Sequence, residues 1–196
     1  TQNEDRPDAS ALVAMDALDG SPRWHHPVSS SIKLSPAAQD GRVFAVTVTG
    51  EVLALDAEDG DPLWTYQLGD ASERWVYSSP LAWRDRLFVG MTPHFVSLDQ
   101  RTGEVDWLRE DLGTRDWIAS YPSPAGFQDY LILAFYGQAL NLAVLAADTG
   151  ETVWLLEEAK SPRTNTTPVV GPDGTVYISN RGSESISNVG WNRTGV

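Results

Sequence analysis

Residues suited to binding chemistry gather in four segments, each of which ends at a proline preceded by serine or threonine. Each segment runs from a tryptophan to that proline over 12 to 17 residues. Lys33, Tyr77, Tyr121 and Asn165 all lie three residues before the proline. Aromatic rings beside arginines suit a flat anionic ligand or a peptide. The candidate ligand- or partner-binding residues are Lys33, Arg74, Trp75, Tyr77, Arg115, Trp117, Tyr121, Arg163 and Asn165. In the alternative interpretation, Trp75 and Trp117 only pack between structural repeats.

No catalytic or metal-binding pattern accompanies these segments. The sequence has no cysteine, which excludes disulfides and thiolate metal sites. Its three histidines, His25, His26 and His94, do not form a spaced metal-binding motif. The serines at 29–31 lack the flanking glycines of a nucleophile elbow. We therefore assign no catalytic residue and no metal site, and we expect no cofactor.

A repeat of 44 residues organises the chain. The four marker prolines, at residues 36, 80, 124 and 168, are 44 residues apart each time. Between them recurs the motif Asp-x-x-x-Gly-x-x-x-Trp, in which alanine replaces aspartate in the last copy. Its members are Asp16, Gly20, Trp24, Asp56, Gly60, Trp64, Asp99, Gly103, Trp107, Gly150 and Trp154. A period of this length is typical of four-stranded propeller blades.

Short runs rich in Val, Phe and Tyr, bounded by Gly, Asp and Pro, predict strands throughout and no substantial helix. We expect an all-β fold, a β-propeller of about four blades with four antiparallel strands in each, forming a single domain over residues 1–196. The expected parts are two outer strands at 11–28, blades at 36–68, 80–110 and 124–157, a partial blade at 168–180 and a tail at 181–196.

Each member of the motif has a structural reason. The glycine suits a tight hairpin turn that needs a positive φ, a conformation costly for other residues. The aspartate can accept hydrogen bonds from N–H groups of the same turn. The tryptophan carries a large apolar ring that can bury ~200 Å² and needs one partner for its indole N–H. A ring delivered once per repeat can therefore hold neighbouring sheets together.

The segments at 14–24, 54–64, 97–107 and 144–154 resemble the tryptophan-docking motif of PQQ-like β-propellers. The resemblance covers about residues 11–180. Quinoprotein alcohol dehydrogenases share this motif, and so does the non-enzymatic lipoprotein of the bacterial outer-membrane β-barrel assembly machinery. The motif implies the fold and says little about function, because it is a packing device. The chain departs from the dehydrogenases in lacking the adjacent cysteines of their quinone site.

The pattern has an incomplete blade at each end. Three interpretations of how the propeller is completed are therefore possible. The outer strands at the N-terminal end could complete the partial blade at the C-terminal end, which would close a four-bladed ring. The chain could also be an open piece of a larger propeller, completed by further sequence or another chain, and we favour this. Finally, two such units could self-associate into an eight-bladed ring, which would remove the exposed sheet edges.

The net charge of −13 argues against nucleic acid and anionic membrane surfaces as partners. No apolar run approaches the ~18 residues of a membrane helix. We expect a non-enzymatic scaffold that binds a protein or peptide, and the family resemblance implies a periplasmic or extracellular location. One alternative is a fragment of a PQQ-dependent alcohol or sugar dehydrogenase, with PQQ and calcium as cofactors. Another is an accessory or sensor domain of a longer enzyme.

Overall fold

The computed structural model describes residues 9–70, 78–91, 94–112, 123–135, 142–156 and 167–178. These residues form antiparallel β-sheets and contain no α-helix. None of them belongs to a helix long and apolar enough to cross a bilayer. The expectation of strands throughout is therefore confirmed for the described part of the chain.

Three sheets have four strands each, and every sheet meanders from its first strand to its last. The first comprises β3 (Ala37–Gln39), β4 (Arg42–Val46), β5 (Glu51–Asp56) and β6 (Pro62–Gln67). The second comprises β7 (Leu81–Trp83), β8 (Arg86–Met91), β9 (His94–Asp99) and β10 (Val105–Arg109). The third comprises β11 (Ala125–Phe127), β12 (Tyr130–Ala134), β13 (Leu142–Ala146) and β14 (Thr152–Leu156).

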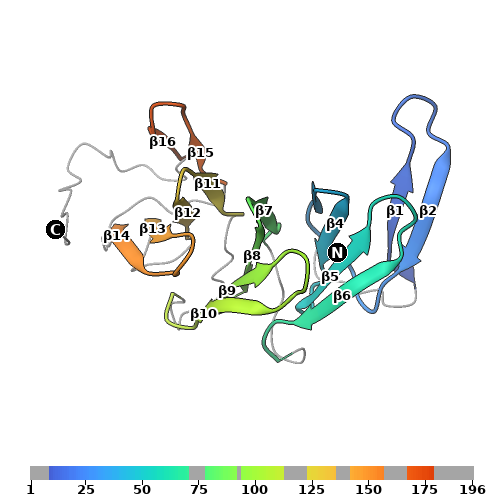
Figure 1. Ribbon diagram of the computed structural model, residues 1–196, viewed down its shortest axis with the longest axis horizontal. Helices are drawn as coiled ribbons and strands as arrows, with labels where there is room; N and C mark the ends of the chain where they lie inside the picture. Colours follow the sequence, from blue (N-terminus) through green and yellow to red (C-terminus); the bar gives the residue numbers. More distant parts are fainter. Residues whose placement is uncertain are drawn as a thin grey trace, which may run out of the picture.

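A two-stranded hairpin lies at each end of this series. One is β1 (Ala11–Met15) with β2 (Pro22–Pro27), and the other is β15 (Val169–Val170) with β16 (Val176–Tyr177). Figure 1 shows the sheets side by side in an arc, with the two hairpins at its opposite ends. The hairpins form separate sheets, so the described strands make an open arc and not a closed four-bladed ring.

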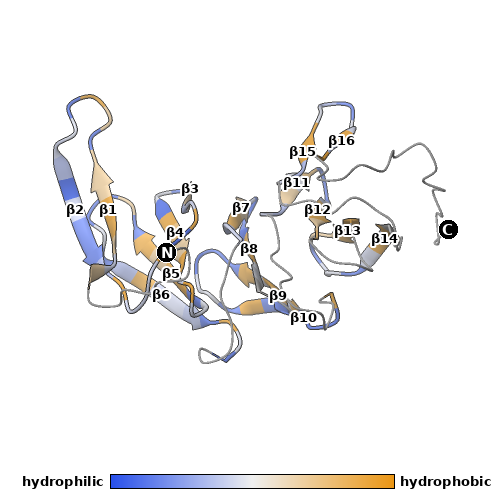
Figure 2. Cartoon of the chain, turned by 180° about the vertical axis from the view of Figure 1, so that it is seen from behind, coloured by the Kyte–Doolittle hydropathy of each residue, from blue (hydrophilic) through white to orange (hydrophobic). Residues whose placement is uncertain are grey.

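The hydrophobic core is divided into layers between neighbouring sheets. In the first sheet Phe44 and Val52 face the second sheet, where they meet Leu87 and Val96. The residues that alternate with them in β4 and β5 pack instead against the β1–β2 hairpin. The inner strands are thus buried on both faces, which explains their nearly continuous hydrophobic sequence. Figure 2 shows this difference, since β7, β8 and β12 are mostly hydrophobic and β2 is hydrophilic.

The strand register repeats from one sheet to the next. Phe44 in β4 is paired with Ala54 in β5, Phe88 with Ser97 in the second sheet, and Ile132 with Val144 in the third. A one-residue slip would turn every buried side chain of a strand to the wrong layer. The layered core therefore specifies the register, and equivalent residues can be compared directly between sheets.

Candidate functional site

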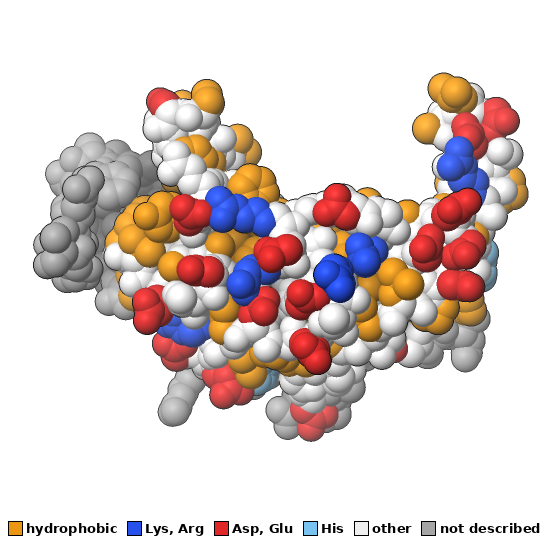
Figure 3. All heavy atoms as spheres, viewed as in Figure 1, with side chains coloured by type: hydrophobic (Ala, Val, Ile, Leu, Met, Phe, Trp, Pro, Cys, Tyr) orange, Lys and Arg blue, Asp and Glu red, His pale blue; other side chains and the backbone are white. Residues whose placement is uncertain are grey.

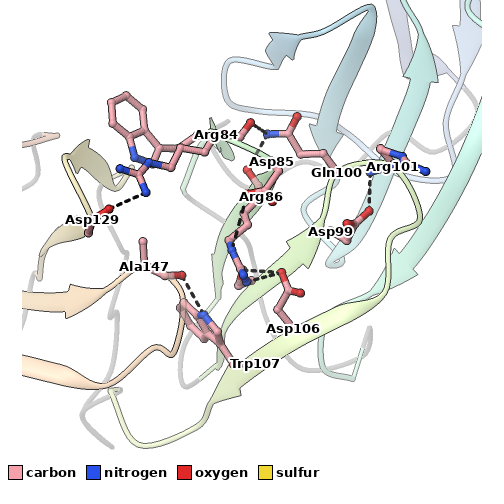
Figure 4. Close-up of polar contacts among 12 residues, drawn as sticks. Arg84, Asp85, Arg86, Asp99, Gln100, Arg101, Asp106, Trp107, Asp129 and Ala147 are labelled. Carbon is pink, nitrogen blue, oxygen red and sulfur yellow. Dashed lines mark hydrogen bonds and ion pairs between the residues drawn. The ribbon is translucent and has the colours of Figure 1, made fainter.

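Each docking tryptophan of the first three motif copies lies against the next sheet along the chain. The indole Nε1 groups of Trp24, Trp64 and Trp107 donate hydrogen bonds to the carbonyl oxygens of Ala57, Gln100 and Ala147, at 3.1, 3.0 and 3.1 Å. Each acceptor lies in the turn before the last strand of the receiving sheet. The last of these bonds is drawn in Figure 4. The buried indole N–H is therefore satisfied, as packing of this ring requires.

The glycine of the motif provides the surface on which the ring lies. A Cβ added to Gly60, Gly103 or Gly150 would come within 2.7 Å of the Cδ2 atom of the docked tryptophan. These three glycines also have φ angles of 80°, 74° and 70°. Two independent requirements thus select glycine here, namely the left-handed turn and the close approach of the ring.

A β-bulge accompanies the tryptophan in all four copies. Ala54 pairs with Trp64 but Leu55 pairs with Pro62, so one residue of the outer strand is left unpaired. The register shifts in the same way beside Trp24, Trp107 and Trp154. Because a bulge bends its strand and re-aims a side chain, it directs the ring toward the neighbouring sheet. The sequence pattern does not predict this bulge.

The aspartate of the motif caps its own turn. The Asp99 carboxylate accepts hydrogen bonds from the backbone N–H groups of Arg101 and Thr102, at 2.8 and 2.9 Å. Burial acts to raise the pKa of Asp99, but these hydrogen bonds and the Arg101 charge outweigh it and lower the pKa below its usual value. Asp16 has a lowered pKa as well, chiefly through its hydrogen bond with Arg23.

We expect Asp99→Asn to destabilise the protein at neutral pH and to have a smaller effect in acid. A carboxyl whose pKa is lowered by folding stabilises the fold above its ordinary pKa of 3.8, and this stabilisation is lost as the pH falls through the folded-state value. The cost at neutral pH should be at most about 1 kcal/mol, since solvent weakens the bonds of a partly exposed carboxylate. Urea unfolding of both proteins at about pH 7 and about pH 3 measures the difference. An equal difference at both pH values would contradict the capping role.

A second set of contacts joins the inner strands, at the turns between the first and second strand of each sheet. Gln39 donates to the backbone oxygen of Arg84, and the indole Nε1 of Trp83 donates to that of Gln128 at 3.4 Å. Arg84 and Gln128 have positive φ angles of 58° and 50°. Figure 4 shows Arg84 pointing toward Asp129 of the third sheet, and their ion pair measures 2.6 Å.

Trp83 was not among the predicted motif residues, although its ring lies closer to Gly126 than the docking tryptophans lie to Gly60, Gly103 and Gly150. A Cβ at Gly126 would lie 2.5 Å from its Cδ2 atom. The 44-residue period could have revealed this contact, because Gln39, Trp83 and Phe127 all lie three residues after a marker proline. Phe127 continues the series by lying against Gly174.

The described residues that directly precede β7 and β11 lie at the other ends of these first strands, away from the turns just described. The backbone N–H of Ser79 donates to the hydroxyl of Ser123 at 2.9 Å, which joins two loops one full repeat apart. Lys33 lies half-buried in the segment before β3, beside Ser31, whose carbonyl accepts the N–H of Val48 at 2.8 Å. We call this end of the arc, defined by Lys33, Ser79 and Ser123, the loop mouth.

The other predicted binding residues lie outside the described residues. They are Arg74, Trp75, Tyr77, Arg115, Trp117, Tyr121, Arg163 and Asn165. Within the described ranges no group of three or more His, Cys, Asp or Glu side chains could hold a metal ion.

The comparisons with known proteins identify the family. A family model described as "Outer membrane protein assembly factor BamB" matches residues 8–195. The chain belongs to this family. Its PQQ-like propeller fold, predicted from the docking motif, is thereby confirmed. No curated protein matches the chain.

Solved structures agree on the BamB-type fold. The crystal structure of BamB from Moraxella catarrhalis has a TM-score of 0.67 at 23% identity, over 88% of this chain and 55% of that one. A europium-containing methanol dehydrogenase has a TM-score of 0.62 at 17% identity, over 79% of this chain and 39% of that one. The computationally designed Ika8 protein has a TM-score of 0.65 at 12% identity, over 89% and 54%.

The chain thus spans about half the length of the BamB structure that it matches. An assembly factor, an enzyme and a designed protein share its architecture, so the fold alone does not select a function.

Proposed function

We propose that this chain is a non-enzymatic scaffold that binds protein or peptide partners outside the cytoplasm, in the assembly of outer-membrane proteins. The observation that carries the proposal is the family match, which spans nearly the whole chain and is described as an outer-membrane assembly factor. Propellers serve such a role by holding many loops on a rigid frame. The periplasm is the compartment that this assignment favours.

The loop mouth is the surface we assign to the partner. The hydrogen bond between Ser79 and Ser123, one repeat apart, supports this assignment. Lys33 lies at the position where the equivalent residues of the next two loops are Tyr77 and Tyr121. A polypeptide lying over this mouth would meet aromatic rings for its apolar side chains and arginines for its carboxylates. The overall charge of −13 would favour a partner whose surface is basic outside the part that lies over the mouth.

Site-specific photo-crosslinking in cells tests the proposal. A photoreactive amino acid replaces Lys33, and in the matched control it replaces Glu58, which is exposed in the turn at the opposite ends of the strands. We expect crosslinks from position 33 to a protein of the outer-membrane assembly machinery, and at least about tenfold fewer from position 58. Alanine at both Tyr77 and Tyr121 should remove the crosslink without changing thermal unfolding. Equal crosslinking at positions 33 and 58, or no crosslink at position 33, would contradict the proposal that the loop mouth binds the partner.

The second candidate function is a fragment of a quinoprotein dehydrogenase, which the similarity to a methanol dehydrogenase favours. The same protein is titrated with PQQ and calcium, and the quinone absorption spectrum and dye-linked alcohol oxidation are recorded. The scaffold proposal predicts neither a shifted spectrum nor oxidation. Saturable quinone binding together with alcohol-dependent dye reduction would contradict the scaffold proposal and support the dehydrogenase.

A further inference from the structure

Arg109, the last residue of β10, connects three parts of the molecule. Its Nε and Nη2 atoms donate to the two carboxylate oxygens of Asp111, each at 2.7 Å. Its Nη1 atom donates to the backbone oxygen of Gly150 at 2.5 Å and to the hydroxyl of Thr152 at 3.2 Å. Gly150 lies in the turn before β14, and Thr152 is the first residue of that strand. One side chain therefore links the second sheet, the third sheet and the residues that follow β10.

The contact between Arg109 and Asp111 fixes a direction as well as a distance. Two parallel N–H···O bonds join the guanidinium to the carboxylate, a geometry that a point charge cannot provide. The hydrogen bond from Arg109 is the main cause that lowers the pKa of Asp111 below its usual value. The Arg109 side chain is 21% exposed and that of Asp111 is 67% exposed. A half-buried arginine, bonded to the third sheet, thus holds an exposed carboxylate in place.

The second sheet has one residue more than the first between its docking tryptophan and the next buried leucine. Leu68 follows Trp64 by four residues, whereas Leu112 follows Trp107 by five. Both leucines are buried in the core layer that their sheet shares with the next one. Asp111 lies directly before the second leucine, in the stretch that contains the extra residue. The bonds from the arginine therefore secure the place where the second sheet departs from the repeat.

This contact lies at the loop-mouth end of the second sheet. The pairing registers place the end of β10 beside the start of β9, and the end of β8 beside the start of β7, which Ser79 precedes. Asp111 begins the segment of the chain that leads to Ser123. The Ser123 hydroxyl accepts the backbone N–H of Ser79 at 2.9 Å. The two described ends of this segment are therefore both anchored, one by Arg109 and the other by Ser79.

We propose that Arg109 is a positioning residue for partner binding at the loop mouth. Through Asp111 it sets the point at which the segment between residues 111 and 123 leaves the second sheet, and its bonds to the third sheet tie that point to the frame. The segment carries the predicted binding residues Trp117 and Tyr121. A binding segment that is fixed at its ends loses less conformational freedom when a partner binds. The inference rests on the proposed function, because it concerns the same partner.

Photo-crosslinking at two positions of the loop mouth tests this role. The photoreactive amino acid replaces Tyr121 in one protein and Lys33 in another, and each is combined with Asp111→Ala. This substitution removes the carboxylate but leaves the bonds from Arg109 to the third sheet in place. The crosslink yield at position 121 should fall by at least about fivefold, and the yield at position 33 by less than about twofold. Thermal unfolding should stay unchanged, because the carboxylate is exposed.

Glu104→Ala is the matched control for the loss of a negative charge. Glu104 is exposed and directly precedes β10, at the end of the strand opposite to Arg109. Figure 3 shows acidic side chains scattered over the face of the molecule, so the loss of one carboxylate changes the surface charge only slightly. Glu104→Ala should therefore leave the crosslink yields at positions 121 and 33 unchanged.

Arg109→Lys separates the geometry of the contact from its charge. Lysine keeps the positive charge but cannot donate two parallel bonds to one carboxylate. We expect this variant to reproduce the loss of the crosslink at position 121 that Asp111→Ala causes, again with the yield at position 33 retained.

Three results would overturn the inference. The first is an equal yield at position 121 in Asp111→Ala and Glu104→Ala. The second is an equal fall at positions 121 and 33, because it would indicate a general loss of binding in place of a local one. The third is a full yield with Arg109→Lys, which would show that charge alone suffices. Absence of crosslinks at both positions without any further substitution would contradict the proposed function, and the inference with it.

Discussion

Trp107→Ala is expected to lower the free energy of unfolding by about 3–5 kcal/mol, the range for truncating a large aromatic residue in a core. The ring lies on Gly150 of the third sheet and donates its N–H to Ala147 at 3.1 Å. It also contacts Phe88 and Phe95 of its own sheet, with ring centroids 5.9 and 5.8 Å apart. Its removal leaves a cavity between two sheets and an unsatisfied carbonyl oxygen, so both packing and hydrogen bonding are lost.

The neighbouring residue provides the control for this substitution. Leu108 follows Trp107 in β10 and is 42% exposed, so Leu108→Ala should change stability by no more than about 0.5 kcal/mol. Trp107→Phe keeps an aromatic ring but loses the indole N–H, and its effect should fall between the two. Urea unfolding followed by circular dichroism measures all three variants. An effect of Trp107→Ala no larger than that of Leu108→Ala would contradict the role of the ring.

Gly126→Ala is expected to destabilise the protein by about 1–3 kcal/mol, the usual cost of overpacking a filled interior. The added Cβ would lie 2.5 Å from Cδ2 and 2.8 Å from Cγ of Trp83. These atoms are near the root of the indole side chain, so the ring cannot move aside by a rotation of its far end. Gly126 does not have a positive φ, unlike the motif glycines, so the substitution measures the close approach without backbone strain.

A double-mutant cycle with Trp83→Ala isolates this contact. Once the ring is gone, the methyl group at position 126 has room, so Gly126→Ala should cost little in the Trp83→Ala background. The coupling free energy should be at least about 1 kcal/mol. Additive effects of the two substitutions would show that Trp83 does not lie on Gly126.

Most of the fold could be predicted from the sequence, because the residues that define it act locally and recur. Gly60 is required by its own turn, the aspartate before it caps that turn, and Trp64 follows at a fixed distance. The layered core follows from strand runs that are hydrophobic on both faces, as in β5. The bulges could not be predicted, since a single extra residue such as Leu63 leaves no mark in composition.

The candidate site was less predictable for a physical reason. A docking ring is selected by packing, and packing leaves a periodic pattern that a single sequence reveals. Binding residues on loops are selected by the partner, and loops of different length, such as those before Pro80 and Pro124, keep no common pattern beyond their ends. Lys33 lies in the loop mouth. That aromatic residues line the mouth beside it stays a prediction, because those residues lie outside the described part of the chain.

The packing of each tryptophan ring on the next sheet is tested most directly by the NMR chemical shifts of the glycine α-protons. Protons beneath the face of an indole ring are shielded and move upfield. The α-protons of Gly60, Gly103 and Gly150 should therefore appear well upfield of those of Gly41, which has the same backbone conformation but no atom within 4 Å of an added Cβ. Substitution of Trp64 by alanine should return the Gly103 signal alone to the Gly41 position. Equal shifts for all four glycines would show that the rings do not lie on the neighbouring sheets, and would contradict the propeller packing on which every other inference depends.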